Sequence, residues 1–223
     1  MSLLPVLQTR IQHQFSAPAL LEQALTHRSY SALNNERLEF LGDSVLNLII
    51  AHQLFDLFPD LPEGDLSRLR AKLVKEASLA EIAVSLHLGD ALRLGEGELK
   101  SAGWRRPSIL ADALEAIVGA VYLDGGYLAA VAVVTALYSD KLKTINPEAI
   151  DKDPKSQLQE YLQGKKMDLP AYQVVSIEGE AHAQTFTVEC HIAKLKLSTT
   201  GVGTSRRIAE QQAAKVAMEK IQS

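Results

Sequence analysis

The 223-residue chain contains one cysteine, Cys190, and only 5% of its residues are aromatic. A single cysteine excludes an internal disulfide framework and suits a reducing compartment. Residues 1–15 show no basic segment followed by an apolar segment and a small-residue cleavage site, so we predict no secretory signal. Apolar runs such as Leu128–Tyr138 are shorter than the roughly 20 residues of a membrane-spanning helix. We therefore expect a soluble cytoplasmic protein without a membrane partner.

The chain also lacks the basic excess that marks many nucleic-acid-binding proteins, since its formal net charge is −4. Residues 1–145 carry 13 lysines and arginines against 17 acidic residues, whereas the remaining residues carry ten of each kind. The acidic excess therefore lies wholly in the first part of the chain. Net charge does not exclude a nucleic-acid partner, because local charged patches decide binding.

Apolar residues recur at three- and four-residue spacing up to about residue 142, which predicts helices almost throughout this part. Breaks are expected where glycine and proline gather, at residues 59–64, 95–107 and 125–126. A short polar stretch follows. We predict an all-α domain over residues 1–145 and a linker over residues 146–153.

The pattern changes after this linker. Asp153 can cap a helix that begins at Pro154 and ends near Gly164. Residues 185–192 alternate strictly between polar and apolar side chains, as a half-buried strand does. Strands are also expected over residues 172–178 and 195–200, and a last helix over residues 205–221. The order α-β-β-β-α predicts a small α+β domain over residues 154–223.

Acidic residues share helix faces within otherwise apolar segments of the first domain. Glu36, Glu39 and Asp43 have the spacing of one helix face, and Asp112 and Glu115 are three residues apart on another helix. Carboxylates are costly to bury, and one pair at about 4 Å repels by about 1 to 4 kcal/mol. A divalent cation would remove both penalties, and ligation by oxygen alone favours Mg²⁺ or Mn²⁺ over zinc.

Spacing alone also allows a structural interpretation of these acids. Asp112 and Glu115 could face solvent, and Glu39 and Asp43 could pair with Arg28 or Arg37. A different nuclease chemistry, which uses two histidines and the RNA 2′-hydroxyl, is disfavoured because the six histidines form no pair at helix or strand spacing. The residues alone therefore predict a candidate divalent-metal site and no particular reaction.

Four segments of the first domain resemble the ribonuclease III family in its bacterial form. The segment NERLEFLGDSVL at residues 35–46 resembles the family signature. The likeness continues in THRSY at residues 26–30, LPEGDLSRLRAKLV at residues 61–74 and SILADALEAIVGAVYLDGG at residues 108–126. The resemblance implies a homodimeric, Mg²⁺-dependent endoribonuclease, in which Mn²⁺ can substitute. It further implies cleavage of double-stranded RNA to 5′-phosphate and 3′-hydroxyl ends with short 3′ overhangs.

The same resemblance assigns roles to individual side chains. It implies that Glu39, Asp43, Asp112 and Glu115 form the catalytic metal cluster. We expect Asp43 and Glu115 to be its most critical members. Glu36 and Glu63 match further acids that support catalysis less directly. Phe40 matches the aromatic residue that inserts into the partner subunit, although an ordinary core phenylalanine is the alternative. Asn34 departs from the histidine often found before the signature.

The C-terminal α-β-β-β-α unit resembles the double-stranded-RNA-binding domain. The residues that match RNA-contacting positions lie on the first helix, in the first strand loop and at the start of the last helix: Lys155, Ser156, Gln159, Glu160, His182, Arg206 and Arg207. Two arginines at a helix N-terminus oppose the helix dipole, so they suggest a bound phosphate, with a solvated surface pair as the alternative. Such a domain reads the shape of A-form RNA rather than its sequence.

Two other functions compete with this interpretation. A non-catalytic double-stranded-RNA-binding protein of the same fold would not need the four acids, so their presence disfavours this alternative. An all-α metal-dependent phosphohydrolase of small molecules would leave the C-terminal unit unexplained. Processing of ribosomal, transfer and messenger RNA precursors is an expectation from the family.

Overall fold

The computed structural model describes residues 3–147, 153–180 and 183–222. The chain separates into two compact units, Met1–Ile150 and Asp151–Ser223. Within the predicted linker 146–153, residues 148–152 lie outside the described ranges.

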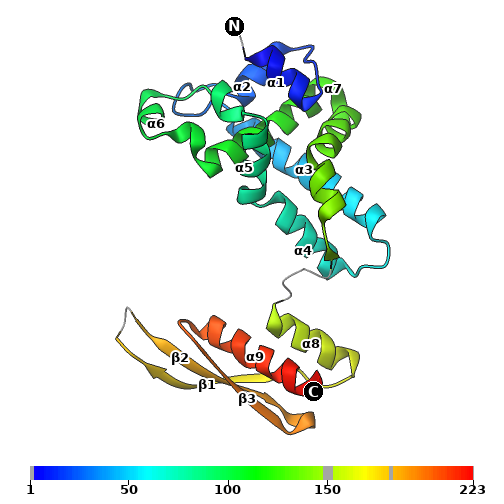
Figure 1. The fold of residues 1–223 in the computed structure, drawn as a ribbon, viewed down its shortest axis with the longest axis vertical. Helices are drawn as coiled ribbons and strands as arrows, with labels where there is room; N and C mark the ends of the chain where they lie inside the picture. The colour runs from blue at the N-terminus through cyan, green and yellow to red at the C-terminus, as the bar shows by residue number, and fades with distance from the viewer. Residues whose placement is uncertain (1–2, 148–152, 181–182, 223) are drawn as a thin grey trace. The chain divides into compact units, whose positions relative to one another are not determined.

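The first unit is helical, as the apolar spacing predicts (Figure 1). Its two principal helices are α3 (Glu36–Leu57) and α7 (Pro107–Thr144). The other helices and 3₁₀ turns are α1 (Leu4–Ile11), α2 (Pro18–Ala24), α4 (Glu63–Val74), α5 (Glu76–Ser85), η1 (Leu88–Ala91), α6 (Glu96–Lys100) and η2 (Gly103–Arg105). One hydrophobic core joins α1–α5 and α7, and α3 and α7 share the most extensive contact in it.

Two glycines allow the backbones of α3 and α7 to touch. A Cβ atom at Gly42 would lie 1.8 Å from the carbonyl oxygen of Glu115, and one at Gly119 would lie 2.2 Å from the carbonyl oxygen of Leu38. No side chain larger than hydrogen fits between backbones at such distances. This close approach brings the acidic positions of α3 beside those of α7.

The expected break at residues 125–126 is a kink within α7 rather than its end. Gly126 adopts φ 76° and ψ −173°, a conformation that favours glycine, and helical structure resumes after it. By length and composition alone, α7 is apolar enough to cross a membrane. Core residues such as Ile117, Val118 and Val134 account for much of that apolar content, as expected for the central helix of a globular unit.

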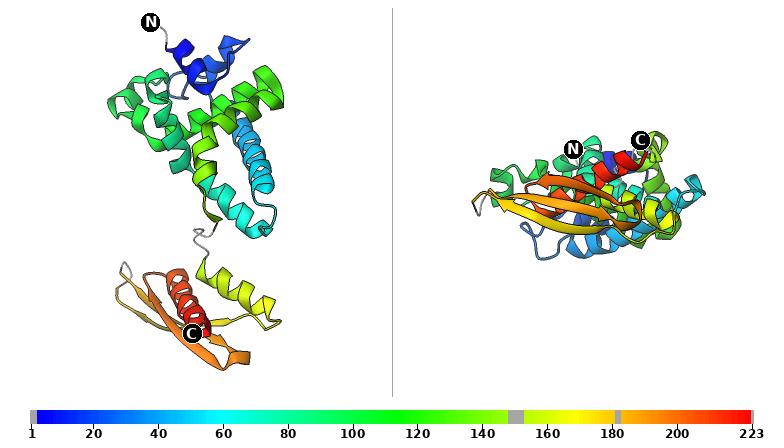
Figure 2. Two further views of the ribbon diagram at one scale, coloured as in Figure 1. Left: turned by 45° about the vertical axis from the view of Figure 1, so that its right-hand side comes forward. Right: turned by 90° about the horizontal axis from the view of Figure 1, so that it is seen from below.

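The second unit contains α8 (Pro154–Gly164), β1 (Ala171–Glu178), β2 (Thr185–Ile192), η4 (Ala193–Leu195), β3 (Leu197–Gly203) and α9 (Arg206–Gln222). The sheet is antiparallel with the order β1-β2-β3. The helix α9, red in Figure 1 and Figure 2, lies across one face of the sheet, and α8 packs against α9. The predicted α+β domain is confirmed.

Local sequence explains where these elements begin and end. The carboxylate of Asp153 accepts a hydrogen bond from the Lys155 backbone N–H at 2.8 Å, which caps α8 as predicted. The strand β3 begins two residues later than expected, because η4 and Lys196 at φ 49° turn the chain first. A Cβ atom at Gly201 would lie 2.2 Å from the Ala213 backbone nitrogen, so β3 and α9 also meet backbone to backbone.

Candidate active site and nucleic-acid interface

Three of the four predicted catalytic acids meet where α3 and α7 cross. Carboxylate oxygens of Glu39, Asp112 and Glu115 lie within 4.8 Å of one another. Asp43 lies one turn beyond Glu39 and is not part of this trio. Its Oδ1 accepts a hydrogen bond from Asn47 at 2.7 Å. Its charge still acts on the trio, since it raises the pKa of both Glu115 and Glu39.

The trio is held in a half-buried, electrostatically unfavourable arrangement. Burial, reinforced by the charges of Asp43, Glu39 and Asp112, raises the pKa of Glu115 to about 8. Burial and then the charge of Glu76 raise the pKa of Asp112, and His27 and Arg28 offset this only in part. Burial and then Asp112 raise the pKa of Glu39. The uncompensated negative charge therefore lies at the crossing of the two helices.

The structural alternative for these acids does not hold in the described residues. Arg28 pairs with Glu36, at 3.3 Å between Nη1 and Oε1, rather than with Glu39 or Asp43. The trio makes no ion pair with any residue of the described ranges and is half-buried rather than solvent-facing. A set of oxygen donors that repel one another suits a hard divalent cation. The donor set therefore fits the predicted type of metal.

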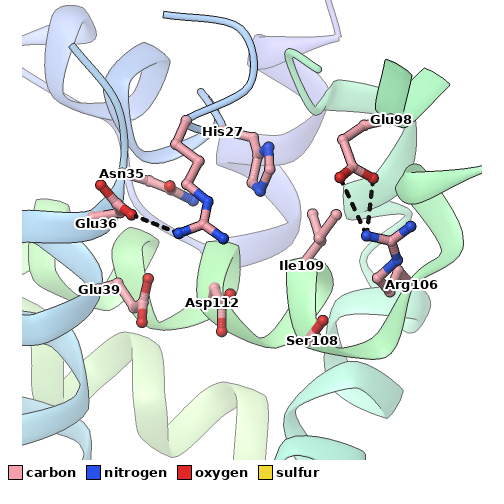
Figure 3. A pocket seen from close by; sticks show the side chains of 10 residues that line it. His27, Asn35, Glu36, Glu39, Glu98, Arg106, Ser108, Ile109 and Asp112 are labelled. Carbon is pink, nitrogen blue, oxygen red and sulfur yellow. Dashed lines mark hydrogen bonds and ion pairs between the residues drawn. The ribbon is translucent and has the colours of Figure 1, made fainter. Parts of the chain in front are cut away.

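A cavity of about 330 Å³ opens beside the cluster (Figure 3). Glu36, Glu39 and Asp112 line it, so the predicted secondary acid Glu36 belongs to the site. Glu63 does not. It begins α4, accepts a hydrogen bond from Ser67 at 2.7 Å, and lines a different cavity with Phe55 and Arg70.

Further residues of this cavity were not predicted from the sequence. They are Asn35, Glu98, Arg106, Ser108 and Ile109. Glu98 and Arg106 come from the segment 95–107, which the sequence presents only as a break between helices. Figure 3 shows them paired at one side of the cavity, facing the acids at the other. No periodic pattern marks this segment. Its only sequence signal is the presence of opposite charges, Glu98 and Arg106, that could form an ion pair.

Phe40 is not a core residue. Its side chain is 79% exposed on α3, next to Glu39, so the core alternative is wrong. Leu48 and Phe55 are also exposed, and helical spacing places them on the same side of α3 as Phe40. An exposed apolar face of this kind is typical of a protein–protein interface.

Two of the three predicted RNA-contacting cations of the second unit are linked by a carboxylate. Glu210 accepts hydrogen bonds from Lys155 at 2.5 Å and from Arg206 at 2.8 Å, which joins α8 to α9. The Lys155 ammonium also lies 4.5 Å from the centroid of the Tyr172 ring. Burial opposes ionisation of Glu210, but the two hydrogen bonds outweigh it and hold the pKa of Glu210 below its ordinary value.

The other predicted contacts are placed less tightly. Gln159 and Glu160 are exposed on α8, and Arg207 is exposed at the start of α9. Ser156 is half-buried, and its backbone N–H points to the capping carboxylate of Asp153. His182 lies outside the described residues. Arg206 differs from these residues, because its hydrogen bond to Glu210 anchors its side chain.

Comparison with known proteins extends over both units. The sequence matches the Ribonuclease-III-like family over residues 17–142 and the double-stranded RNA binding motif over residues 154–221. It is 61% identical to a Ribonuclease 3 of Thiobacillus denitrificans, over 97% of this chain and 96% of the relative. It is 59% identical to a Ribonuclease 3 of Bordetella petrii, over 99% of this chain and 87% of the relative.

Solved structures resemble the first unit. One crystal structure of the nuclease domain of ribonuclease III from Campylobacter jejuni has a TM-score of 0.63 and 44% identity, and covers 66% of this chain and all of that chain. A second structure of that domain, described as flexible in a region involved in dimer formation, has a TM-score of 0.59 and 47% identity. It covers 60% of this chain and 94% of that chain.

Proposed function

This chain belongs to the ribonuclease III family and is an endoribonuclease of double-stranded RNA, and we propose that it hydrolyses the RNA phosphodiester with Mg²⁺. The cleaved RNA would carry 5′-phosphate and 3′-hydroxyl ends. The non-catalytic alternative does not hold for a member of this family with all four acids present. The observation that carries the proposal is the trio of carboxylates within 4.8 Å.

Glu39, Asp43, Asp112 and Glu115 would hold the cation, and Mn²⁺ could replace it. When bound, Mg²⁺ supplies an activated water and a counter-charge for the phosphate and the leaving oxygen. The contribution of the chain is to fix the acids before the cation arrives. The contact of α3 with α7 at Gly42 and Gly119 fixes their backbone positions, so little reorganisation remains. Glu36 pairs with Arg28, and both residues line the cavity beside the acids.

The proposed domain arrangement is an endonuclease domain over residues 1–145, a linker over residues 146–153 and an RNA-binding domain over residues 154–223. We propose that the exposed face of α3 around Phe40 pairs two copies of the chain, as a closed two-fold dimer would. Two such sites could cut opposite strands and leave short 3′ overhangs. Glu63 would then act from outside the acidic cluster of its own chain.

In the RNA-binding domain, three groups of side chains would recognise the duplex. Lys155, Ser156, Gln159 and Glu160 lie on α8, His182 is the predicted loop contact, and Arg206 and Arg207 begin α9. Contacts of this kind read 2′-hydroxyls and phosphates across the minor groove. Structured RNAs in the cytoplasm, including precursors of ribosomal, transfer and messenger RNA, are the proposed substrates.

The test is incubation of an end-labelled RNA duplex with the full chain, with Mg²⁺ and with EDTA. We expect cleavage with Mg²⁺ only, with products that a ligase requiring 5′-phosphates can rejoin. Glu115→Gln should lower the cleavage rate by at least about 100-fold, because it removes a metal ligand. Glu96→Gln is the control, since Glu96 lies on the surface of α6 and pairs only with Lys100 in the described residues. Equal rates for the two variants would refute the assignment of the site.

A further inference from the structure

We propose that the N-terminus of α7 forms a subsite for an RNA phosphate adjacent to the one being cleaved. Arg106, Ser108 and Asn35 would contact the RNA strand there, and Glu98 would be the positioning residue for Arg106. The inference rests on the proposed function, because the ligand it assigns is the backbone of the same RNA substrate. Nothing in the sequence motifs points to Glu98 or Arg106.

The first observation is the uncapped start of α7, a helix of 38 residues. Arg106 occupies the N-cap position without a side-chain cap, and Pro107 has no N–H. The first backbone bond of the helix is Leu110 N–H to Arg106 O, which leaves the N–H groups of Ser108 and Ile109 without acceptors in the described residues. Both residues line the cavity beside the acids. Free N–H groups and the helix dipole together favour an anion at this point.

The second observation is a fixed guanidinium at the same place. Arg106 Nη1 lies 3.0 and 3.2 Å from the two carboxylate oxygens of Glu98, and its Nη2 lies 3.3 Å from Ser101 Oγ. Figure 3 shows Glu98 and Arg106 side by side across the cavity from Glu36. A guanidinium has five donors, so these contacts leave donors for a ligand. A pre-positioned guanidinium loses little conformational entropy when a phosphate binds.

The third observation is a side-chain amide that lines the cavity without a hydrogen-bond partner in the described residues. Asn35 is only 2% exposed, and its side chain makes no hydrogen bond with the described residues. It lines the same cavity, and in Figure 3 its amide is turned toward the interior. A ribose hydroxyl or phosphate oxygen of the substrate would supply the missing partner.

Helix geometry separates this subsite from the metal cluster. Arg106 precedes Asp112 by six residues, which corresponds to about 9 Å along the axis of α7. We therefore assign the phosphate at Arg106 as a neighbour of the scissile one. Positive groups at this distance would hold a strand that the acids alone would repel.

The test compares Arg106→Gln with Arg105→Gln in the full-length chain, on a duplex with a single cleavage site. Arg105 is the matched control, because its guanidinium lies 4.1 Å from the Trp104 ring centroid and lines a separate cavity. We expect Arg106→Gln to raise KM about 10-fold, the usual effect of one lost charged hydrogen bond, with kcat within about twofold. Arg105→Gln should leave both constants unchanged.

Neutral methylphosphonate linkages, placed one at a time beside the cleavage site, identify the phosphate. One such position should raise KM for the unaltered chain about 10-fold and have no further effect on Arg106→Gln. Glu98→Gln should also raise KM, and the double variant should be no worse than Arg106→Gln alone. Additive losses would show that Glu98 does not act through Arg106.

The possible failures are distinguishable. If the unaltered chain does not cut duplex RNA with Mg²⁺, the proposed function is wrong and the subsite falls with it. Two outcomes would refute the subsite alone, provided that the unaltered chain cuts duplex RNA. One is an Arg106→Gln variant with the same KM as the unaltered chain. The other is that every neutral linkage changes KM equally for the unaltered chain and for Arg106→Gln. Equal thermal midpoints for the two arginine variants would establish that folding is not the cause of a difference.

Discussion

Replacing Glu115 by glutamine should stabilise the cation-free protein while it removes activity. Folding raises the pKa of this carboxyl from the ordinary 4.5 to about 8. Between these pH values the folded state binds more protons than the unfolded state, so stability falls as pH rises through this window. Glutamine has the same shape and cannot ionise, so its variant should lack this decline.

The size of the effect follows from the same pKa change. A change from 4.5 to about 8 corresponds to at most ~5 kcal/mol. Partial solvent exposure of the carboxylate reduces this to about 2 kcal/mol at pH 8.5. For a unit of this size the thermal midpoint should rise by about 4 to 8 °C. Calorimetry of the nuclease-unit transition in EDTA, well below pH 4.5 and again at pH 8.5, measures the difference.

The two proteins should melt within about 1 °C of each other well below pH 4.5, where Glu115 is protonated in both the folded and the unfolded state. Addition of Mg²⁺ at pH 8.5 should reverse the order, because the cation stabilises only the chain that retains its ligand. A variant that melts below the unaltered chain at pH 8.5 in EDTA would refute the claim that the ionised cluster is strained.

Three further substitutions probe the helix contact, the exposed face and the second unit. Gly42→Ala should destabilise the protein by about 3 kcal/mol or more in chemical unfolding, since its Cβ would lie 1.8 Å from the Glu115 carbonyl oxygen, whereas Gly97→Ala meets nothing within 4 Å and should be nearly neutral. Phe40→Ala should weaken self-association at least 10-fold by sedimentation, with Val84→Ala, at another exposed apolar residue, as control. Glu210→Gln should cost the second unit about 1 to 2 kcal/mol at pH 7. The loss should vanish in acid, because the depressed pKa of Glu210 contributes stability above pH 4.5 that disappears as pH falls.

Opposite results would contradict each of these expectations. A fully stable Gly42→Ala variant would mean that α3 and α7 do not touch at this point. Unchanged self-association of Phe40→Ala would remove the exposed face of α3 from the dimer. A Glu210→Gln variant that is equally stable at every pH would show that the links to Lys155 and Arg206 are not formed in solution.

Sequence periodicity was sufficient to predict the helical first unit, the alternating strand β2 and the acidic faces of α3 and α7. It could not show that Gly42 and Gly119 bring two backbones into contact, because a glycine within a helix pattern has several explanations. It could not place Asp43 either, since the turn of that carboxylate toward Asn47 depends on side-chain geometry. Spacing therefore predicts which acids are available, and packing decides which of them meet.

Interactions between residues far apart in the sequence were beyond such prediction. Glu210 lies 55 positions from Lys155, and no local pattern links them. Arg106 comes from a segment with no periodicity and acquires its place from Glu98 and the start of α7. The pair of Arg206 with Glu210 is different, because its i, i+4 spacing on one helix could have been recognised in the sequence.

The most direct test of the whole account is a crystal of the chain soaked in Mn²⁺, with anomalous diffraction used to locate the ion. We expect a peak bounded by carboxylate oxygens of Glu39, Asp112 and Glu115, with Asp43 completing the proposed ligand set, and its loss in Glu115→Gln. A peak elsewhere, or none at millimolar Mn²⁺, would contradict the claim that these acids are brought together to hold the catalytic cation.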